Sequence, residues 1–266
     1  MNVDAYLERI AYPGSLAPTA ATLRELQVAH LLTVPFENLS IHSGEPIVLA
    51  DEALFTKIVT RKRGGFCYEC NGLFAALLRA LGFEVSMLSA EVAHAAGGFS
   101  QPFDHMALMV QLDQPWLVDV GFGDSFLEPL RLDERSAQVQ SRRSYRLLAD
   151  GAYLILSRRD SNERGNDEWQ AQYRFTLEPY QYNDFSRMCH YHQTAPESHF
   201  TQGRICSRAT AGGGRITVSA AAGTTPSDMR LTTTSGKGDR HERVLQSREE
   251  YADVLQKDFG VVIGEA

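Results

Sequence analysis

Apolar residues recur at helical spacing in the first third of the chain. Between residues 19 and 34 they lie on roughly one helical face: Leu23, Leu26, Val28, Leu31 and Leu32. A second stripe of this kind follows Cys67 and ends at Leu81, and Gly82 is a natural helix stop just beyond it. We therefore expect two amphipathic helices, the second of which begins near a cysteine.

The pattern changes to that of β-strands after residue 82. Four segments are short and apolar or alternating: 83–92, 103–112, 116–122 and 167–176. A turn at residues 113–115 joins the second segment to the third. In the fourth, Trp169, Ala171, Tyr173 and Phe175 fall on one side. The middle of the chain is therefore expected to form a sheet.

The last third mixes both patterns. Two short strands are expected at residues 203–208 and 215–220, around a run of three glycines. A final helix is expected at residues 247–259, because Ser247 and Glu250 form a capping box and Gly260 follows. The order of helices, sheet and a small mixed segment predicts an α+β fold. We expect three parts: a helical part at 1–83, a sheet part at 84–190 and an α/β part at 191–266.

Composition and charge narrow the choice of partners. The 266 residues are 43% hydrophobic and 22% charged, which is typical of a globular protein, and the net charge is −7. That charge argues against a nucleic-acid or anionic-membrane partner, but leaves room for a local basic patch. No apolar run reaches the roughly 18 residues of a transmembrane helix, and the first residues lack a signal-peptide pattern. The four cysteines are therefore expected to be free thiols in a reducing cytoplasm.

Cys67 has the setting of a reactive thiol. It follows three basic residues and two glycines, and it opens the second predicted helix. A helix N-terminus and nearby cations favour a thiolate, so we expect the pKa of Cys67 to be lowered. The glycines would let the chain turn sharply and a ligand approach closely. The alternative is a buried structural cysteine.

Catalysis by a thiolate also needs a base and a group that orients it. Seven of the eight histidines lie at helix ends, in loops or in polar stretches, whereas His105 lies within an apolar strand pattern. Asp119 is an acid among apolar residues of the next predicted strand, where it is costly unless paired. A pair of the two would account for both costly positions, with His105 as the base and Asp119 as the carboxylate that orients it. A symmetric two-residue turn would not place them opposite each other, so a longer loop or a bulge is required.

Five segments, in this order, resemble the signature segments of the arylamine N-acetyltransferases: 34–39 (VPFENL), 63–69 (RGGFCYE), 103–106 (FDHM), 118–123 (VDVGFG) and 200–206 (FTQGRIC). The resemblance extends from about Tyr6 to the C-terminus, and the spacing and flanking residues also agree. It implies an N-terminal helical bundle, a central β-barrel and a C-terminal α/β lid, around a Cys-His-Asp core like that of the cysteine proteases.

The same resemblance implies the chemistry. Cys67 would be the nucleophile, His105 the base and Asp119 its orienting carboxylate. Acetyl-CoA would be the co-substrate, with no permanently bound cofactor and no metal. The acetyl group would pass through a Cys67 thioester to an arylamine, arylhydrazine or arylhydroxylamine by a ping-pong reaction.

The resemblance also implies binding residues. Phe36, Phe122 and Phe200 would line the acceptor pocket, and Gly121 and Gly123 would border the cleft through which the acetyl donor enters. We further expect Glu37 and Arg63 to form an ion pair, because each carries an unexplained charge in a segment that belongs to the resemblance.

Cys70 and the stretch 189–192 (CHYH) depart from the family pattern. Cys67 and Cys70 form a C-x-x-C motif, but a thioredoxin-like site would need a βαβ context, so we expect Cys70 to be a bystander. A zinc site built from these cysteines and the 189–192 stretch lacks the usual paired spacing. A papain-like or transglutaminase-like hydrolase, with the same order of cysteine, histidine and acid, is the main alternative function.

Overall fold

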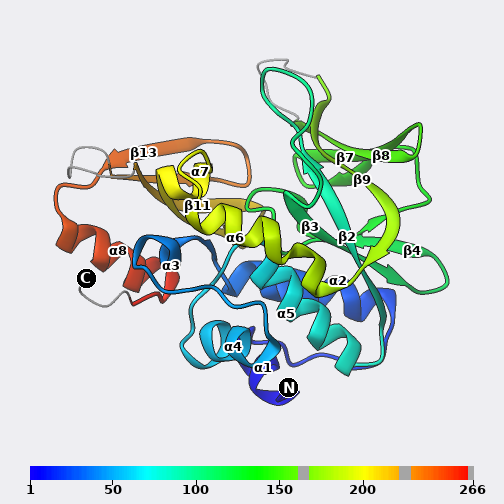
Figure 1. Ribbon diagram of the computed structural model, residues 1–266, viewed down its shortest axis with the longest axis horizontal. Helices are drawn as coiled ribbons and strands as arrows, with labels where there is room; N and C mark the ends of the chain where they lie inside the picture. The colour runs from blue at the N-terminus through cyan, green and yellow to red at the C-terminus, as the bar shows by residue number, and fades with distance from the viewer. Residues whose placement is uncertain (161–167, 222–228, 263–266) are drawn as a thin grey trace.

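The computed structural model describes residues 1–160, 168–221 and 229–262. Helices fill the first third of the chain, and two sheets with a few helices fill the rest (Figure 1). The N-terminal elements are α1 (Val3–Arg9), α2 (Ala20–Thr33), α3 (Leu39–His42), α4 (Asp51–Phe55), a π-helical turn (Thr56–Thr60) and α5 (Cys67–Ala80). Both helices expected in this part are confirmed, as α2 and α5.

Local side chains explain where these helices begin and end. The Asn2 side chain accepts a hydrogen bond from the Ala5 amide and begins α1, and the Thr19 side chain does the same for α2 through the Thr22 amide. The buried face of α2 includes Gln27 and His30, whereas the expected Val28, Leu31 and Leu32 are only partly buried.

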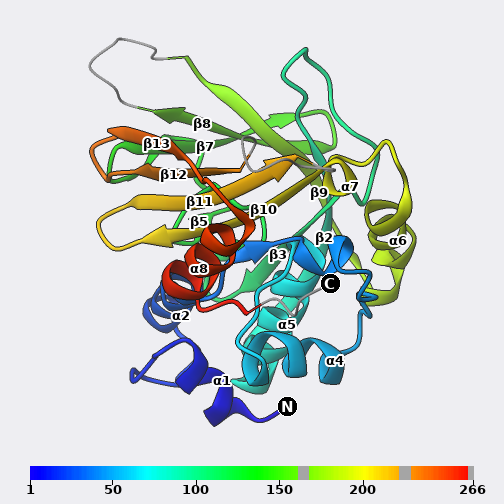
Figure 2. The ribbon, with the colours of Figure 1, turned by 90° about the vertical axis from the view of Figure 1, so that its left-hand side faces the viewer.

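Eight antiparallel strands form the middle layer and curl into a nearly closed barrel (Figure 2). Their order in the sheet is β5-β4-β3-β2-β9-β8-β7-β6. In chain order they are β2 (Glu84–Val92), β3 (His105–Gln111), β4 (Pro115–Val118), β5 (Leu130–Arg131), β6 (Gln138–Gln140), β7 (Arg143–Asp150), β8 (Tyr153–Asp160) and β9 (Gln170–Tyr180). Three of the expected strands are present as β2, β3 and β9, although residues 161–167 lie outside the described residues. The expected strand 116–122 ends earlier, at Val118, and β5 to β8 were not predicted.

A second sheet contains strands from both ends of the chain. Its order is β1-β10-β11-β12-β13. The strands are β1 (Phe36–Glu37), β10 (Gly203–Thr210), β11 (Gly214–Ala221), β12 (Arg230–Thr234) and β13 (Arg240–Val244). The pair formed by β1 and β10 fixes the segment before Cys67 to the C-terminal sheet. The strands β12 and β13 were not predicted.

The remaining helices border these sheets. They are a 3₁₀ turn (Tyr182–Phe185), α6 (Ser186–Thr194), α7 (His199–Gln202) and α8 (Arg248–Phe259). The expected C-terminal helix is confirmed as α8: Ser247 accepts from the Glu250 amide, and Gly260 ends the helix with a φ of 70°. The reciprocal half of the capping box is wrong, because the Glu250 carboxylate accepts from the Gln246 amide instead.

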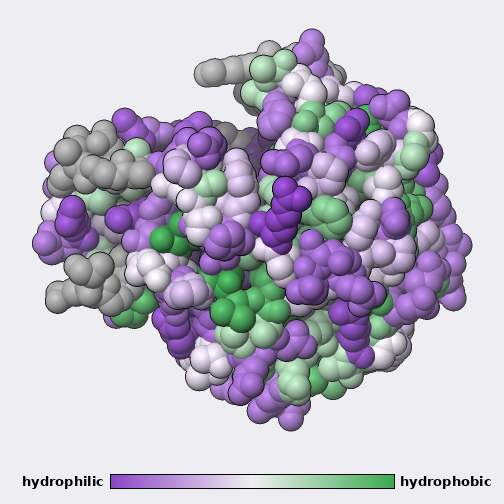
Figure 3. Space-filling model, viewed as in Figure 1, coloured by the Kyte–Doolittle hydropathy of each residue, from purple (hydrophilic) through white to green (hydrophobic). Residues whose placement is uncertain are grey.

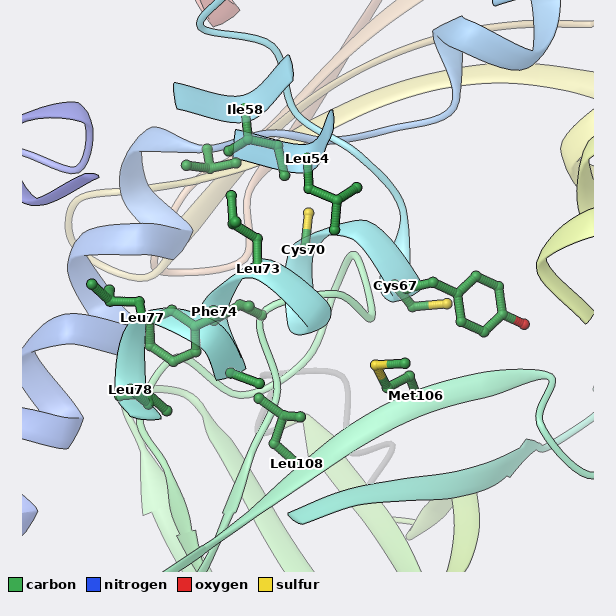
Figure 4. Packing of buried hydrophobic residues seen from close by; sticks show 14 of the residues in the cluster. Leu54, Ile58, Cys67, Cys70, Leu73, Phe74, Leu77, Leu78, Met106 and Leu108 are labelled. Carbon is green, nitrogen blue, oxygen red and sulfur yellow. The ribbon is translucent and has the colours of Figure 1, made fainter. Parts of the chain in front are cut away.

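Buried apolar residues form three clusters, one around α5, one inside the barrel and one between α8 and the second sheet. Figure 4 shows the first, in which side chains of α5 pack against Leu54, Ile58 and Leu108. Hydrophilic residues cover most of the face in Figure 3, and a notch separates the part that carries the second sheet from the upper barrel. The division at residues 83 and 190 stays a prediction, and its second border lies within α6.

Candidate active site

Cys67 is the first residue of α5 and is almost fully buried. Two glycines make the approach to it possible: a Cβ atom on Gly64 would lie 1.9 Å from the Pro35 carbonyl oxygen, and one on Gly65 would lie 2.6 Å from the Glu69 Cβ atom. The Glu69 carboxylate accepts from the Phe66 amide at 3.1 Å, which caps the helix. Both positions must therefore lack a side chain for the backbone to place Cys67 at the N-terminus of the helix.

His105 and Asp119 meet because of the register of β3 and β4. Leu108 pairs with Val118 and Gln111 with Pro115, so three residues connect the two strands. This loop is one residue longer than a two-residue turn, but it still does not place His105 directly opposite Asp119. Continuing the ladder by one pair places Asp119 opposite Ala107, so that His105 is two residues further along on the same face. The predicted contact is present: His105 Nε2 lies 2.8 Å from Asp119 Oδ2.

Four donors hold the Asp119 carboxylate. Oδ1 accepts from Asn71 Nδ2 and from the Gly121 amide, both at 2.9 Å. Oδ2 contacts His105 and accepts from the Tyr173 hydroxyl at 3.1 Å. Burial raises the pKa of Asp119, but its contacts with His105, Asn71 and Gly121 outweigh burial and lower the pKa below its usual value. Asp119 is therefore a fixed anion behind the imidazole.

Asn71 and Tyr173 were not predicted as site residues. Asn71 follows Cys67 by one helical turn, and it also donates to the Met106 carbonyl at 2.7 Å and accepts from the Val120 amide at 2.9 Å. Tyr173 comes from β9, where only the alternation of side chains was visible in the sequence. A polar residue one turn after the nucleophile was the single available signal.

Cys67 and His105 line one cavity of about 550 Å³. Three expected acceptor-pocket residues, Phe36, Phe122 and Phe200, also line it, as does Gly121. Gly123 is not among the lining residues; its φ is 89°, and a Cβ atom there would lie 3.4 Å from the Phe36 ring. The cavity has polar walls too, formed by Asp104, His199, Arg204 and Arg230.

The stretch 189–192 reaches this cavity indirectly. Cys189 and His192 are buried on α6. His192 Nε2 lies 3.1 Å from a carboxylate oxygen of Asp104, and Asp104 is part of the cavity wall. His192 also contacts the Ser198 hydroxyl through Nδ1 at 3.0 Å. The unusual stretch therefore supports the wall beside the candidate base.

The expected lowering of the Cys67 pKa by upstream cations is wrong. Burial raises the pKa of the Cys67 thiol well above its usual value. The upstream cations are occupied elsewhere, since Arg63 pairs with Glu37 and Arg61 pairs with Glu45. The upstream cations therefore do not stabilise a thiolate at this position.

The expected ion pair of Glu37 and Arg63 is confirmed. Arg63 Nη2 lies 2.8 Å from Glu37 Oε1, and both side chains are buried. Two further charges belong to the same network: Lys57 Nζ lies 2.7 Å from Glu69 Oε1 and 4.0 Å from Glu37 Oε1. Lys57 was missed because nothing in its local sequence distinguishes it. The network lies beside the turn that leads to Cys67 and fixes this turn to β1.

Tyr68 connects α5 to the turn before His105. Its hydroxyl donates to the carbonyl oxygens of Phe103 at 2.7 Å and Asp104 at 3.1 Å. Phe103 has a φ of 67°, a left-handed conformation that is strained for a bulky residue. The residue after Cys67 thus holds the residue before His105 in place.

Cys70 is a free thiol that faces away from the cavity. Its Sγ contacts the Gly65 carbonyl oxygen at 3.1 Å. Figure 4 shows its sulfur directed toward Leu54 and Leu73, whereas the Cys67 sulfur points elsewhere. All four cysteines are free. This geometry agrees with the expected bystander role, which stays a prediction.

Residues 1–160, 168–221 and 229–262 contain neither a group of potential metal ligands nor a helix that could span a membrane. No three histidine, cysteine, aspartate or glutamate side chains are grouped there so as to hold a metal ion. No helix in these ranges is long and apolar enough to cross a membrane.

Comparison with known proteins identifies the family. A family model described as N-acetyltransferase matches residues 19–266. Arylamine N-acetyltransferase 2 of Mus musculus is 35% identical over an alignment of 278 positions, which covers 98% of this chain and 94% of the mouse protein. The chain belongs to the arylamine N-acetyltransferase family. Acetyl transfer is the function of this family.

Solved structures of arylamine N-acetyltransferases have the same fold. That of Salmonella typhimurium matches with a TM-score of 0.88 and 30% identity, over 99% of this chain and 92% of its own. That of Mycobacterium marinum, solved in complex with CoA, matches with a TM-score of 0.85 and 32% identity, over 97% and 92% of the two chains.

Proposed function

We propose that this chain transfers an acetyl group from acetyl-CoA to an arylamine, arylhydrazine or arylhydroxylamine, through a thioester on Cys67. The observation that carries the proposal is the cavity lined by Cys67 and by a His105 that contacts a buried Asp119. The family supports both substrates: relatives are named for arylamines, and the Mycobacterium marinum protein is solved with CoA.

In the first half-reaction, His105 takes the Cys67 proton as the sulfur attacks the thioester carbonyl carbon. Because burial raises the pKa of Cys67, transfer to a neighbouring imidazole is more favourable than release to water. The imidazolium is stabilised by Asp119 at 2.8 Å. The tetrahedral intermediate collapses, the CoA sulfur leaves with the proton from His105, and acetyl-Cys67 remains.

In the second half-reaction, the amine attacks acetyl-Cys67 and loses a proton to His105. The Cys67 sulfur leaves and is reprotonated, which returns the enzyme to its starting state. The Cys67 amide is our candidate oxyanion donor, because the first amides of a helix lack intrahelical acceptors. Asn71 and Tyr173 fix Asp119 and thereby the orientation of the imidazole.

The acceptor ring is proposed to bind among Phe36, Phe122 and Phe200, which lie on three different elements around the cavity. Gly121 is proposed to border the entrance of the donor; it packs directly against Cys67, because a Cβ atom there would lie 2.6 Å from the Cys67 Cα atom. Gly123 is proposed to border the same entrance. The predicted cytoplasmic location stays a prediction.

Initial rates with acetyl-CoA and an arylamine test this function. Parallel double-reciprocal lines, loss of turnover in Cys67→Ala and retention in Cys206→Ala are expected, since Cys206 is equally buried but lies in the second sheet. A hydrolase would instead release acetate at a rate that added amine leaves unchanged. That result would reject acetyl transfer in favour of the hydrolase alternative.

A further inference from the structure

Four arginine side chains gather where the barrel meets the second sheet. Arg142 and Arg143 lie at the start of β7, Arg158 comes from β8 and Arg215 from β11. We call these four the arginine cluster. Their side chains are only 13–17% exposed. The two sheets therefore bring like charges together with little water between them.

One carboxylate, that of Asp124, holds three members of the arginine cluster. Arg143 contacts it through two nitrogens at 2.6 and 2.9 Å, and Arg215 Nε lies 2.9 Å from Oδ1. Arg158 is more distant, with Nη1 3.5 Å from Oδ2. These contacts lower the pKa of Asp124 despite its burial, which raises it.

A second carboxylate, Asp160, is shared as well. Its oxygens lie 3.4 Å from Arg142, 3.0 Å from Arg143 and 3.4 Å from Arg158. Four positive charges thus share two negative charges, so these six residues carry a net charge of +2, which Glu128 in the wall of the adjoining cavity reduces to +1. Repulsion among partly buried like charges is weakly screened, so an added anion would be attracted to this place.

A cavity of about 130 Å³ opens on the cluster. Arg142, Arg143 and Arg215 line it together with Ser125 and Ser141, and Asp124 and Glu128 contribute negative charge. Ser125 is only 8% exposed, and its hydroxyl has no hydrogen-bond partner among the described residues. Arg142 Nε likewise has no hydrogen-bond partner among the described residues. Two buried donors beside the cavity, the Ser125 hydroxyl and Arg142 Nε, therefore lack an acceptor among the described residues.

We propose that this cavity binds a small oxyanion, with phosphate as the ligand. A guanidinium fork matches the oxygen pairs of a phosphate, and a hydroxyl supplies a further donor. The volume would hold about four water molecules at roughly 30 Å³ each, so a single tetrahedral anion fits. The site is separate from the acetyl-transfer cavity, because the two share no lining residue.

Occupancy would fasten the two sheets to each other. Arg215 belongs to the second sheet and Arg143 to the barrel, and both contact the loop that carries Asp124. The same loop, which follows β4, also contains Gly121, which lines the acetyl-transfer cavity. Bound phosphate should therefore raise the stability of the whole chain, independently of whether acetyl transfer occurs.

The first test measures the melting temperature against phosphate concentration, with sodium chloride at equal ionic strength as the reference. At a concentration a hundred-fold above Kd, a rise of roughly 5 to 10 °C over the chloride series is expected. Arg142→Gln should remove most of this rise. Arg131→Gln should keep it, because Arg131 is exposed and pairs with Asp133 outside the cavity. Equal rises in both variants, or in chloride, would reveal a general salt effect and overturn the proposal.

Calorimetric titration of the full chain with inorganic phosphate provides a measurement on the unaltered protein, which does not depend on whether a variant folds. One site is expected in the unaltered protein, and Ser125→Ala should weaken it by roughly five-fold, the effect of one lost hydrogen bond. Titrations with CoA and dephospho-CoA distinguish two sources of the phosphate. If inorganic phosphate competes with CoA but not with dephospho-CoA, the natural ligand of the site is the phosphate group of the donor. If phosphate binds independently of both, the ligand is the free anion. No heat with either ligand would overturn the site while leaving the proposed acetyl transfer intact.

Discussion

Glu37→Gln is the variant whose effect the structure specifies most closely. Glu37 is fully buried, and its Oε1 accepts from Arg63 Nε at 3.0 Å while its Oε2 accepts from the Leu39 amide at 2.7 Å. Glutamine keeps the size of the side chain but removes the charge. Its amide nitrogen must also face either Arg63 or the Leu39 amide, both of which are donors. The substitution thus leaves a buried guanidinium without its nearest counter-charge.

The magnitude follows from the burial of the pair. Breaking a buried ion pair on one side costs about 3–5 kcal/mol, because the remaining charge stays out of water. For a chain of this length, each kcal/mol lowers the melting temperature by about 2 to 4 °C, so a fall of roughly 6 to 20 °C is expected. Lys57, 4.0 Å from Glu37, loses part of its counter-charge as well.

Thermal unfolding of matched variants checks this reasoning. Arg24→Gln is the control, because it breaks an exposed pair with Glu128, and such pairs contribute at most about 1 kcal/mol. Acetyl transfer by Glu37→Gln should fall too, since Arg63 adjoins the two glycines that lead to Cys67. A Glu37→Gln protein that melts and turns over like Arg24→Gln would refute the argument.

Three other results are expected. Cys70→Ala should retain most of the acetyl transfer that Cys67→Ala loses under reducing conditions, because its sulfur faces away from the cavity; comparable losses would reopen a redox role. Tyr68→Phe should slow acetylation by roughly ten- to a hundred-fold by releasing the turn before His105, with pre-steady-state rates as the measure. Burial lowers the pKa of His30 to about 3, so the unfolded chain binds a proton that the folded chain refuses. The free energy of unfolding should therefore fall as the pH drops from about 6.5 toward 3. Denaturant titrations at several pH values should show that this free energy depends less on pH in His30→Gln.

The sequence predicted elements whose signals are local. The helices α2, α5 and α8 combine one apolar face with a cap or a glycine stop, and each lies within a residue or two of the expected place. The strands β7 and β8 were missed because charged residues interrupt their alternation. These residues include Arg143 and Arg146 in β7 and Arg158 in β8, and Arg143 and Arg158 contact Asp124 in the loop between β4 and β5.

The site was predictable only in part, because its contacts join residues that are far apart in the sequence. His105 and Asp119 were recognisable as costly charges in apolar strands, but their contact depends on a three-residue loop that fixes the register. Tyr173 and Lys57 meet their partners 54 and 12 residues away, and no local pattern marks either. The Cys67 pKa was misjudged because the sequence shows nearby cations but not the carboxylates that pair with them.

Intact-mass analysis after incubation with acetyl-CoA alone tests the central claim most directly. Without an amine, the second half-reaction cannot proceed, and the acetyl group should stay on the protein. The account predicts one added acetyl group on the unaltered chain, its loss on addition of an arylamine, and none on Cys67→Ser. Equal labelling of Cys67→Ser would contradict the account, because the acetyl group would then reside on another residue.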